Sequence, residues 1–206
     1  PIPTIAYVSS PPRIDGDGDE WSSDPNVEYV QENPITTDAN RMVVRLAWDE
    51  HSLYLLAEIH DRQIVQLTHE PARIYLNDAV ELYIDPLDDS ANRMDINDYQ
   101  FIVDHTGAAT VLKGEKALIL DSTTRAPKDS GISTVAYQYA TQLLRDEQDV
   151  GIGYCVELAL PFGGLGVVPR EGCRLKLDFC VDDLDSLVDL ATIAENGHLP
   201  GFFASN

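Results

Sequence analysis

Apolar and polar residues alternate along this chain in short runs, which are separated by clusters of Asp, Asn, Gly, Pro and Ser. Such alternation is typical of β-strands with one buried face, because successive side chains of a strand point to opposite sides of the sheet. Helical periodicity is weak throughout the chain. The pattern predicts strands at residues 41–48, 53–60, 79–85, 99–104, 108–112, 134–144, 153–160 and 174–181.

Polar turns between these runs indicate hairpins. Asp49-Glu50-His51-Ser52 joins the first two predicted strands, and His105-Thr106-Gly107 joins the fourth to the fifth. The tail 182–206 loses the alternation and is predicted to be a loop that packs back on the strands. The predicted fold class is therefore all-β: a single domain over residues 1–206, built as an antiparallel β-sandwich with the two-sheet architecture of jelly rolls and immunoglobulin domains.

Alternation also sorts the polar side chains by face. The strand at 79–85 directs its apolar residues to the core and Glu81 to the opposite side. In the strand at 153–160, Glu157 likewise lies opposite the core residues. Trp48 shares its side with apolar residues of its own strand, which indicates a core residue and not an exposed aromatic platform.

The charge of the chain narrows the classes of partner. Against 35 Asp and Glu stand 14 Lys and Arg, which gives a formal net charge of -21 and a pI near 4.3. This charge would repel phosphate backbones and anionic lipid headgroups, so we expect neither nucleic acid nor a membrane surface as partner. No stretch is apolar enough to insert into a membrane, and no signal peptide precedes Pro1, as expected of a mature exported protein or an excised domain.

Three cysteines, Cys155, Cys173 and Cys180, make an odd number without CxxC spacing. This indicates neither a disulfide framework nor a zinc site, although one disulfide stays open. The sequence also has no GxSxG elbow, no P-loop and no dinucleotide fingerprint. We therefore predict that the domain is not an enzyme by itself.

Acidic residues form one short cluster that suits a hard cation. Asp15, Asp17 and Asp19 alternate with glycines, which brings three carboxylates within a short reach of one another, as Ca²⁺ prefers. The residues alone leave a solvated turn as the alternative. Further candidate ligands lie at strand ends, where loops could share an ion: Asp49, Asp61 and Asp78.

Five fragments, in order and at plausible spacing, match one known family. They are IDGDGDEW at 14–21, LAWDEHSLYL at 46–55, NDAVELYIDP at 77–86, DYQF at 98–101 and GYCVELALPF at 153–162. With them the chain resembles the family 9 carbohydrate-binding modules over nearly its whole length. The resemblance implies a β-sandwich stabilised by calcium, which favours the metal interpretation of the acidic cluster. It also implies a non-catalytic slot that holds sugar or oligosaccharide ends.

The resemblance assigns roles to particular residues. Tyr75 falls where such modules stack an aromatic ring on the sugar, and Glu81 and Gln100 fall where they hydrogen-bond its hydroxyls. Tyrosine replaces the usual tryptophan there and offers a smaller stacking face. The remaining slot residues implied by the resemblance are an arginine and a second aromatic, for which the chain offers Arg93, Phe202 and Phe203.

Two settings fit such a binding domain, and both are secreted, periplasmic or otherwise extracytoplasmic. One is a module attached to a catalytic domain such as a glycoside hydrolase. The other is the ligand-sensing domain of a membrane receptor such as a sensor kinase, with a transmembrane segment elsewhere in the polypeptide. A remote third possibility is a haem-binding sandwich, with Met42 or Met94 and His60 as axial ligands.

Overall fold

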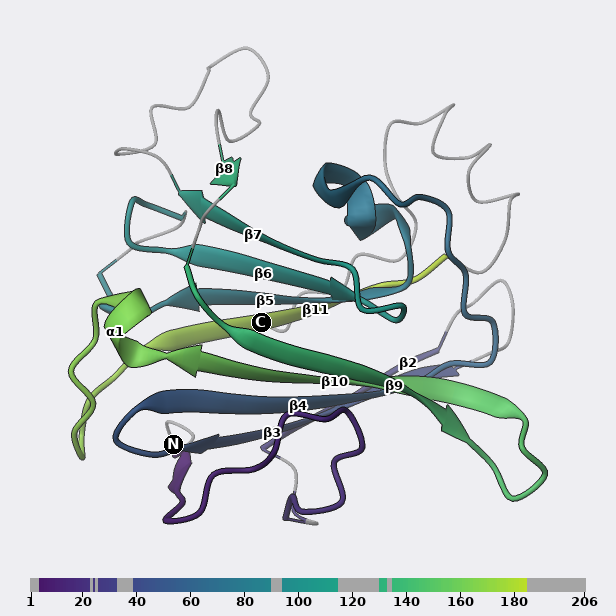
Figure 1. Ribbon diagram of the computed structural model, residues 1–206, viewed down its shortest axis with the longest axis horizontal. Helices are drawn as coiled ribbons and strands as arrows, with labels where there is room; N and C mark the ends of the chain where they lie inside the picture. The colour runs from purple at the N-terminus through teal and green to yellow at the C-terminus, as the bar shows by residue number, and fades with distance from the viewer. Residues whose placement is uncertain are drawn as a thin grey trace.

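Two β-sheets pack face to face in the computed structural model, which describes residues 4–22, 24, 26–32, 39–89, 94–114, 130–132 and 135–184 (Figure 1). The first sheet has the strand order β1-β3-β4-β10-β9, with β2 also paired to β3, and the second has the order β11-β5-β6-β7-β8. All pairings are antiparallel except that of β1 with β3. The strands are β1 Ala6–Tyr7, β2 Val27–Glu32, β3 Ala39–Trp48, β4 Ser52–His60, β5 Ala79–Asp85, β6 Tyr99–Asp104, β7 Ala109–Gly114, β8 Ser130–Ile132, β9 Gln138–Arg145, β10 Gly151–Pro161 and β11 Lys176–Asp182.

The predicted β-sandwich is thus confirmed, and so are its hairpins. β3 pairs with β4, β5 with β6, and β6 with β7. β5 and β6 have the predicted bounds, whereas the strand predicted at 134–144 begins only at Gln138. β1, β2 and β8 were not predicted; β1 has two residues and β8 three, too few for alternation to be recognised.

The core lies between the inner faces of the two sheets. Leu55 and Val156 of the first sheet and Leu82 and Phe101 of the second are among its fully buried residues. Trp48 packs against this core, as predicted from its face of the strand. Within the described residues, no helix is long and apolar enough to cross a membrane.

Two short helical segments lie at opposite ends of the strands. The 3-10 helix η1 (Pro71–Leu76), the blue coiled segment in Figure 1, precedes β5 and packs on the outer face of the second sheet. The helix α1 (Phe162–Leu165) follows β10 at the other end and buries Phe162 and Leu165 in the core. The candidate sites lie at these two ends of the strands and on the outer faces of the two sheets.

Candidate functional site

A polar triangle forms on the outer face of the second sheet, where Tyr83 on β5 lies across from Gln100 on β6. The Tyr83 hydroxyl donates a hydrogen bond of 2.5 Å to Glu81 Oε2. The Gln100 amide donates to the same carboxylate oxygen at 2.9 Å and to the Tyr83 oxygen at 2.8 Å. Burial, followed by the charge of Glu81, raises the pKa of Tyr83, so the phenol stays protonated and acts as a donor.

Glu81 points away from the main core, as alternation predicts, but it is only 2% exposed. Alternation predicted its face correctly, but not its burial. Alternation determines which face a side chain takes, whereas burial also depends on what covers that face. A second carboxylate lies beside it: Asp182 on β11, whose pKa is raised well above its usual range by burial and then by the charge of Glu81.

An apolar cluster borders this triangle and brings in η1. Ile102, the cross-strand partner of Glu81, packs with Ile74 and Ala79, and Tyr75 packs against them as a half-buried residue. The structure thus brings three of the predicted slot residues, Tyr75, Glu81 and Gln100, onto one face of the sheet. The other three lie outside the described residues: Arg93, Phe202 and Phe203.

Three carboxylates converge where β4 ends, β5 begins and β11 ends. Asp61, Asp78 and Asp183 each place an oxygen within 4.8 Å of the others. Asp78 is 1% exposed; its carboxylate accepts hydrogen bonds from the backbone N–H groups of Val65 and, at 2.7 Å, of Leu184. Burial, reinforced by the charges of Asp61 and Asp183, raises the pKa of Asp78 to about 8.

A buried phenol completes the surroundings of this carboxylate cluster. Tyr154 on β10 is fully buried, and its hydroxyl makes no hydrogen bond to any residue that the structure describes. Burial and the charges of Asp78 and Asp61 raise its pKa well above the usual value. Alternation assigned Tyr154 to the core, which is correct for its ring, but nothing in the pattern indicated that its hydroxyl faces a set of carboxylates.

The loop before β5 is held firmly enough to keep Asp78 in place. The side-chain oxygen of Asn77 accepts hydrogen bonds from the N–H groups of Leu67 and Thr68 at 2.8 and 2.9 Å. Its amide donates to Asp104 Oδ2 on β6 at 2.7 Å. The two residues of this Asn-Asp pair therefore differ in role. Asn77 fixes the loop through hydrogen bonds, and Asp78 supplies a carboxylate to the cluster.

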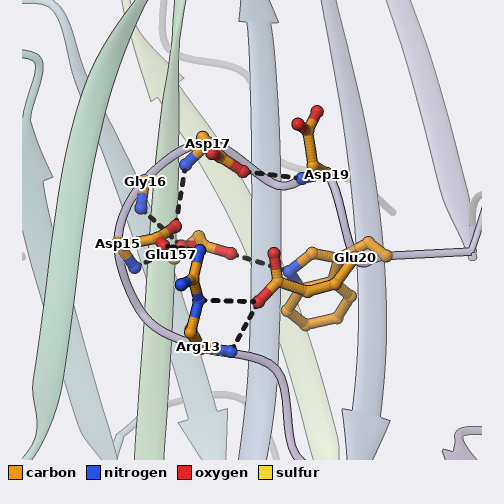
Figure 2. A network of polar contacts seen from close by, with 8 residues as sticks. Arg13, Asp15, Gly16, Asp17, Asp19, Glu20 and Glu157 are labelled. Carbon is orange, nitrogen blue, oxygen red and sulfur yellow. Dashed lines mark hydrogen bonds and ion pairs between the residues drawn. The ribbon is translucent and has the colours of Figure 1, made fainter.

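The acidic loop at 13–21 has a different environment (Figure 2). Its backbone N–H groups at Asp15 and Gly16 donate to Glu157 Oε2 at 2.9 and 2.6 Å, and the Trp21 indole donates to Glu157 Oε1 at 2.7 Å. The loop thereby covers the outer face of β10, and Glu157 is 0% exposed. The carboxylates of this loop were predicted to hold a metal. Its backbone N–H groups supply hydrogen bonds to the buried carboxylate of Glu157.

The side chains of that loop remain at the surface. Oxygens of Asp15, Asp17 and Glu20 lie within 4.8 Å of one another, but the Arg13 guanidinium already contacts Asp15 at 2.6 Å and Glu20 at 3.7 Å. Asp19 is not part of this group; its N–H donates to Asp17 Oδ1 at 2.9 Å. The guanidinium of Arg13 therefore already supplies a positive charge beside two of these carboxylates.

Asp49, the remaining predicted metal ligand, serves the β3–β4 turn. Its carboxylate accepts hydrogen bonds from the N–H groups of His51 and Ser52, at 2.7 and 2.8 Å, and from the Tyr54 hydroxyl at 2.9 Å. It belongs to no metal-sized group of ligands among the described residues. Of the predicted ligands, the structure brings together Asp15 and Asp17 in the exposed loop, and Asp61 and Asp78 at the strand ends. To the second pair it adds Asp183, which the sequence pattern placed in an irregular tail.

Comparison with known proteins agrees with this architecture. Residues 14–196 match the model of the family described as carbohydrate family 9 binding domain-like. The chain belongs to this family. No curated protein matches the chain.

Solved structures of family 9 modules superpose on this family 9 domain. A carbohydrate-binding module of family 9 from Caldicellulosiruptor kristjanssonii in complex with cellotriose has a TM-score of 0.61 and 25% identity, covering 89% of this chain and 78% of that one. A complex of such a module from the same organism with glucose gives 0.59 and 26%, covering 89% and 80%. A putative carbohydrate-binding protein from Bacteroides uniformis, at 0.62 and 13% identity over 97% and 87% of the chains, shares the fold.

Proposed function

We propose that this domain is a non-catalytic carbohydrate-binding module that holds sugar or oligosaccharide ends on the outer face of its second sheet. The observation that carries the proposal is the polar triangle of Glu81, Tyr83 and Gln100 next to the apolar cluster that contains Tyr75. Family membership supports it, as do the complexes of the two Caldicellulosiruptor modules with cellotriose and glucose. A sugar ring needs both elements, because its faces are apolar and its edges carry hydroxyls.

The chemistry of the triangle suits hydroxyl recognition. A carboxylate accepts charge-assisted hydrogen bonds, which are shorter and stronger than neutral ones. The Gln100 amide and the Tyr83 hydroxyl hold Glu81 in a fixed orientation, so less conformational freedom is lost when a ligand binds. Since Glu81 is buried, a sugar hydroxyl reaches it by taking the place of one of these two donors.

The test is calorimetric titration of the wild-type domain with glucose, xylose, cellobiose and cellotriose. We expect Tyr75→Ala to weaken binding about tenfold and Glu81→Gln by about ten- to a hundredfold, since 1.4 kcal/mol corresponds to a factor of ten. Tyr139→Ala is the matched control, because Tyr139 is an exposed tyrosine on β9 of the other sheet. Absence of heat with all four sugars, or equal loss in the control, would contradict the proposal.

We also propose that calcium binds between Asp61, Asp78 and Asp183 and stabilises the fold. Three carboxylates from separate chain segments provide the hard oxygen ligands that Ca²⁺ prefers. Burial, and after it the charges of Asp61 and Asp183, raises the pKa of Asp78, and a bound cation would offset both effects. The Tyr154 hydroxyl has no hydrogen-bond partner among the described residues, and the charges of Asp78 and Asp61 help to raise its pKa. It would add a neutral polar group to the calcium site.

Calcium should therefore raise the melting temperature, and a chelator should reverse the effect. At a calcium concentration a hundredfold above Kd the gain is about 2.7 kcal/mol, or about 5–10 °C for a domain of this size. The Asp78→Asn variant should lose this calcium-dependent increment, whatever its melting temperature without calcium. Asp15→Asn in the exposed loop should keep it. An increment that survives in Asp78→Asn but disappears in Asp15→Asn would place the ion in the acidic loop instead.

The setting of the module follows from its ligand. Cell-wall polysaccharides lie outside the cytoplasm, so we propose an exported domain, attached to a catalytic domain or to a membrane receptor. Sequence flanking these residues in the parent polypeptide would separate the two settings: a glycoside hydrolase domain supports the first, and a transmembrane segment supports the second.

A further inference from the structure

A cavity of about 520 Å³ lies beside α1, and neither η1 nor the polar triangle contributes a residue to its lining. Its floor is apolar and partly aromatic, because the end of β3 contributes Trp48, the start of β4 contributes Leu53, and α1 contributes Phe162. The loop between α1 and β11 forms the opposite wall and includes Val167 and Leu175. Size and lining are those of a small-molecule site.

The indole of Trp48 is fixed in this floor. Its Nε1 donates a hydrogen bond of 3.2 Å to the Ile5 carbonyl, and its ring meets that of Tyr7 edge-on at a centroid distance of 5.1 Å. A preorganised aromatic surface loses little entropy when a flat ligand packs on it. The floor therefore favours a planar apolar group.

The lining of the cavity carries charges of both signs, in a chain with a formal net charge of -21. Of the 14 Lys and Arg residues, three line the cavity, Arg170, Arg174 and Lys176, together with the carboxylates of Asp88 and Glu171. Two of the three cations are already neutralised, since Arg174 contacts Asp88 at 3.4 Å and Lys176 contacts Asp88 at 3.2 Å. Lys176 also contacts Asp85 at 3.1 Å.

Arg170 differs from the other two cations. Its side chain is exposed, and it takes part in no ion pair or hydrogen bond within the described part of the chain. A turn holds its backbone in place, since the Cys173 N–H donates to the Arg170 carbonyl at 3.0 Å. The planar guanidinium can pair with a carboxylate through two parallel hydrogen bonds.

We infer that this cavity is a second ligand site, separate from the sugar face, which takes a small aromatic carboxylate. The ring packs on Trp48, Leu53 and Phe162, and the carboxylate pairs with Arg170 at the mouth. The acidic surface elsewhere repels anionic ligands, so a carboxylate is bound here through Arg170, the lining cation that forms no ion pair with a described residue.

The cavity carries its own reporter for the test. Cys173 lines it and is exposed, whereas Cys155 and Cys180 are buried. Reaction of the native protein with a chromogenic disulfide reagent such as DTNB therefore measures access to the cavity. We expect 1-naphthoate to slow this reaction saturably, and the neutral analogue 1-naphthamide to protect at least tenfold more weakly.

Variants decide whether Arg170 is responsible. Arg170→Glu should weaken protection by 1-naphthoate at least tenfold. Arg62→Glu, the same charge change at an exposed arginine just after β4, should change it less than twofold. The inference is overturned if 1-naphthoate gives no protection at millimolar concentration, or if naphthamide protects equally well. Equal effects of the two variants would overturn it too, as would protection by cellotriose, since the cavity would then belong to the sugar site. Only protection by cellotriose bears on where sugars bind; the other outcomes leave the proposed sugar site beside Glu81 unaffected.

Discussion

The Glu157→Ala variant should lose about 3 kcal/mol of stability, which corresponds to a fall of about 6–12 °C in melting temperature. Glu157 is buried and accepts three hydrogen bonds, from the N–H groups of Asp15 and Gly16 and from the Trp21 indole. Truncation removes the acceptor for all three donors at once. Part of the loss is offset, because a buried carboxylate no longer has to be desolvated. Thermal unfolding followed by circular dichroism measures the result.

Release of the loop gives a second, local measurement. Trypsin cleaves after Arg13, which lies within the loop that Glu157 holds. We expect faster cleavage at this bond in Glu157→Ala under native conditions. Glu147→Ala is the matched control, since Glu147 is exposed in the β9–β10 hairpin, and it should change neither quantity. A melting temperature within 2 °C of the control would mean that the loop is held by its apolar contacts alone.

The acidic loop shows that the side chains and the backbone of one segment can have separate roles. Asp15, Asp17 and Asp19 were predicted to bind metal because alternating carboxylates and glycines suit Ca²⁺. In the structure the backbone of the same segment donates hydrogen bonds to Glu157. This residue lies 142 positions after Asp15 and 141 positions after Gly16 in the chain. Glu157 thus holds the loop over β10 through its backbone, and metal binding by the loop's carboxylates stays a prediction.

Strand positions and faces could be predicted from the sequence, because alternation is a local property. β5 and β6 have the predicted bounds, and Val80, Leu82 and Ile84 lie in the core as expected. The segment η1 was missed because six residues are too few to show helical periodicity.

The sequence pattern could not predict which segments, distant in the chain, cover the outer face of a strand. Glu81 and Glu157 both lie on the predicted face, yet both are buried by parts of the chain that are distant in sequence. The carboxylate cluster depends on the same kind of information. Asp61 and Asp78 were recognised as residues at strand ends, but only the pairing of β11 with β5 brings Asp183 to them.

The sugar face also differs from what resemblance alone implied. Tyr75 is held in an apolar cluster and Glu81 in a polar triangle, so both side chains of the proposed slot already contact neighbouring residues. Ile102, which lies across from Glu81, adds apolar surface where a further polar group could have bound hydroxyls. We therefore expect recognition to depend more on the sugar's apolar face than on the number of hydroxyls contacted.

Among the glycines whose surroundings the structure describes, Gly153→Ala should be the most damaging substitution, with a loss of about 4 kcal/mol or more. Gly153 has φ of 149° and lies at an irregularity in the pairing of β10 with β9. A Cβ added there would lie 1.9 Å from the Ile59 carbonyl oxygen of β4. That oxygen belongs to the backbone of the central β4–β10 pair, so it cannot move aside as a flexible side chain would.

The effect should reach the carboxylate cluster as well. The Asp61 N–H donates to the Ile152 carbonyl at 3.1 Å, one residue before Gly153, and Tyr154 follows one residue after it. Gly151→Ala is the matched control, because nothing lies within 4 Å of a Cβ at that position. In urea unfolding we expect Gly151→Ala to stay within about 1 kcal/mol of wild type. If Gly153→Ala were equally mild, β4 and β10 would have to be free to move apart, and the rigid backbone that positions Asp61 beside Asp78 would not exist.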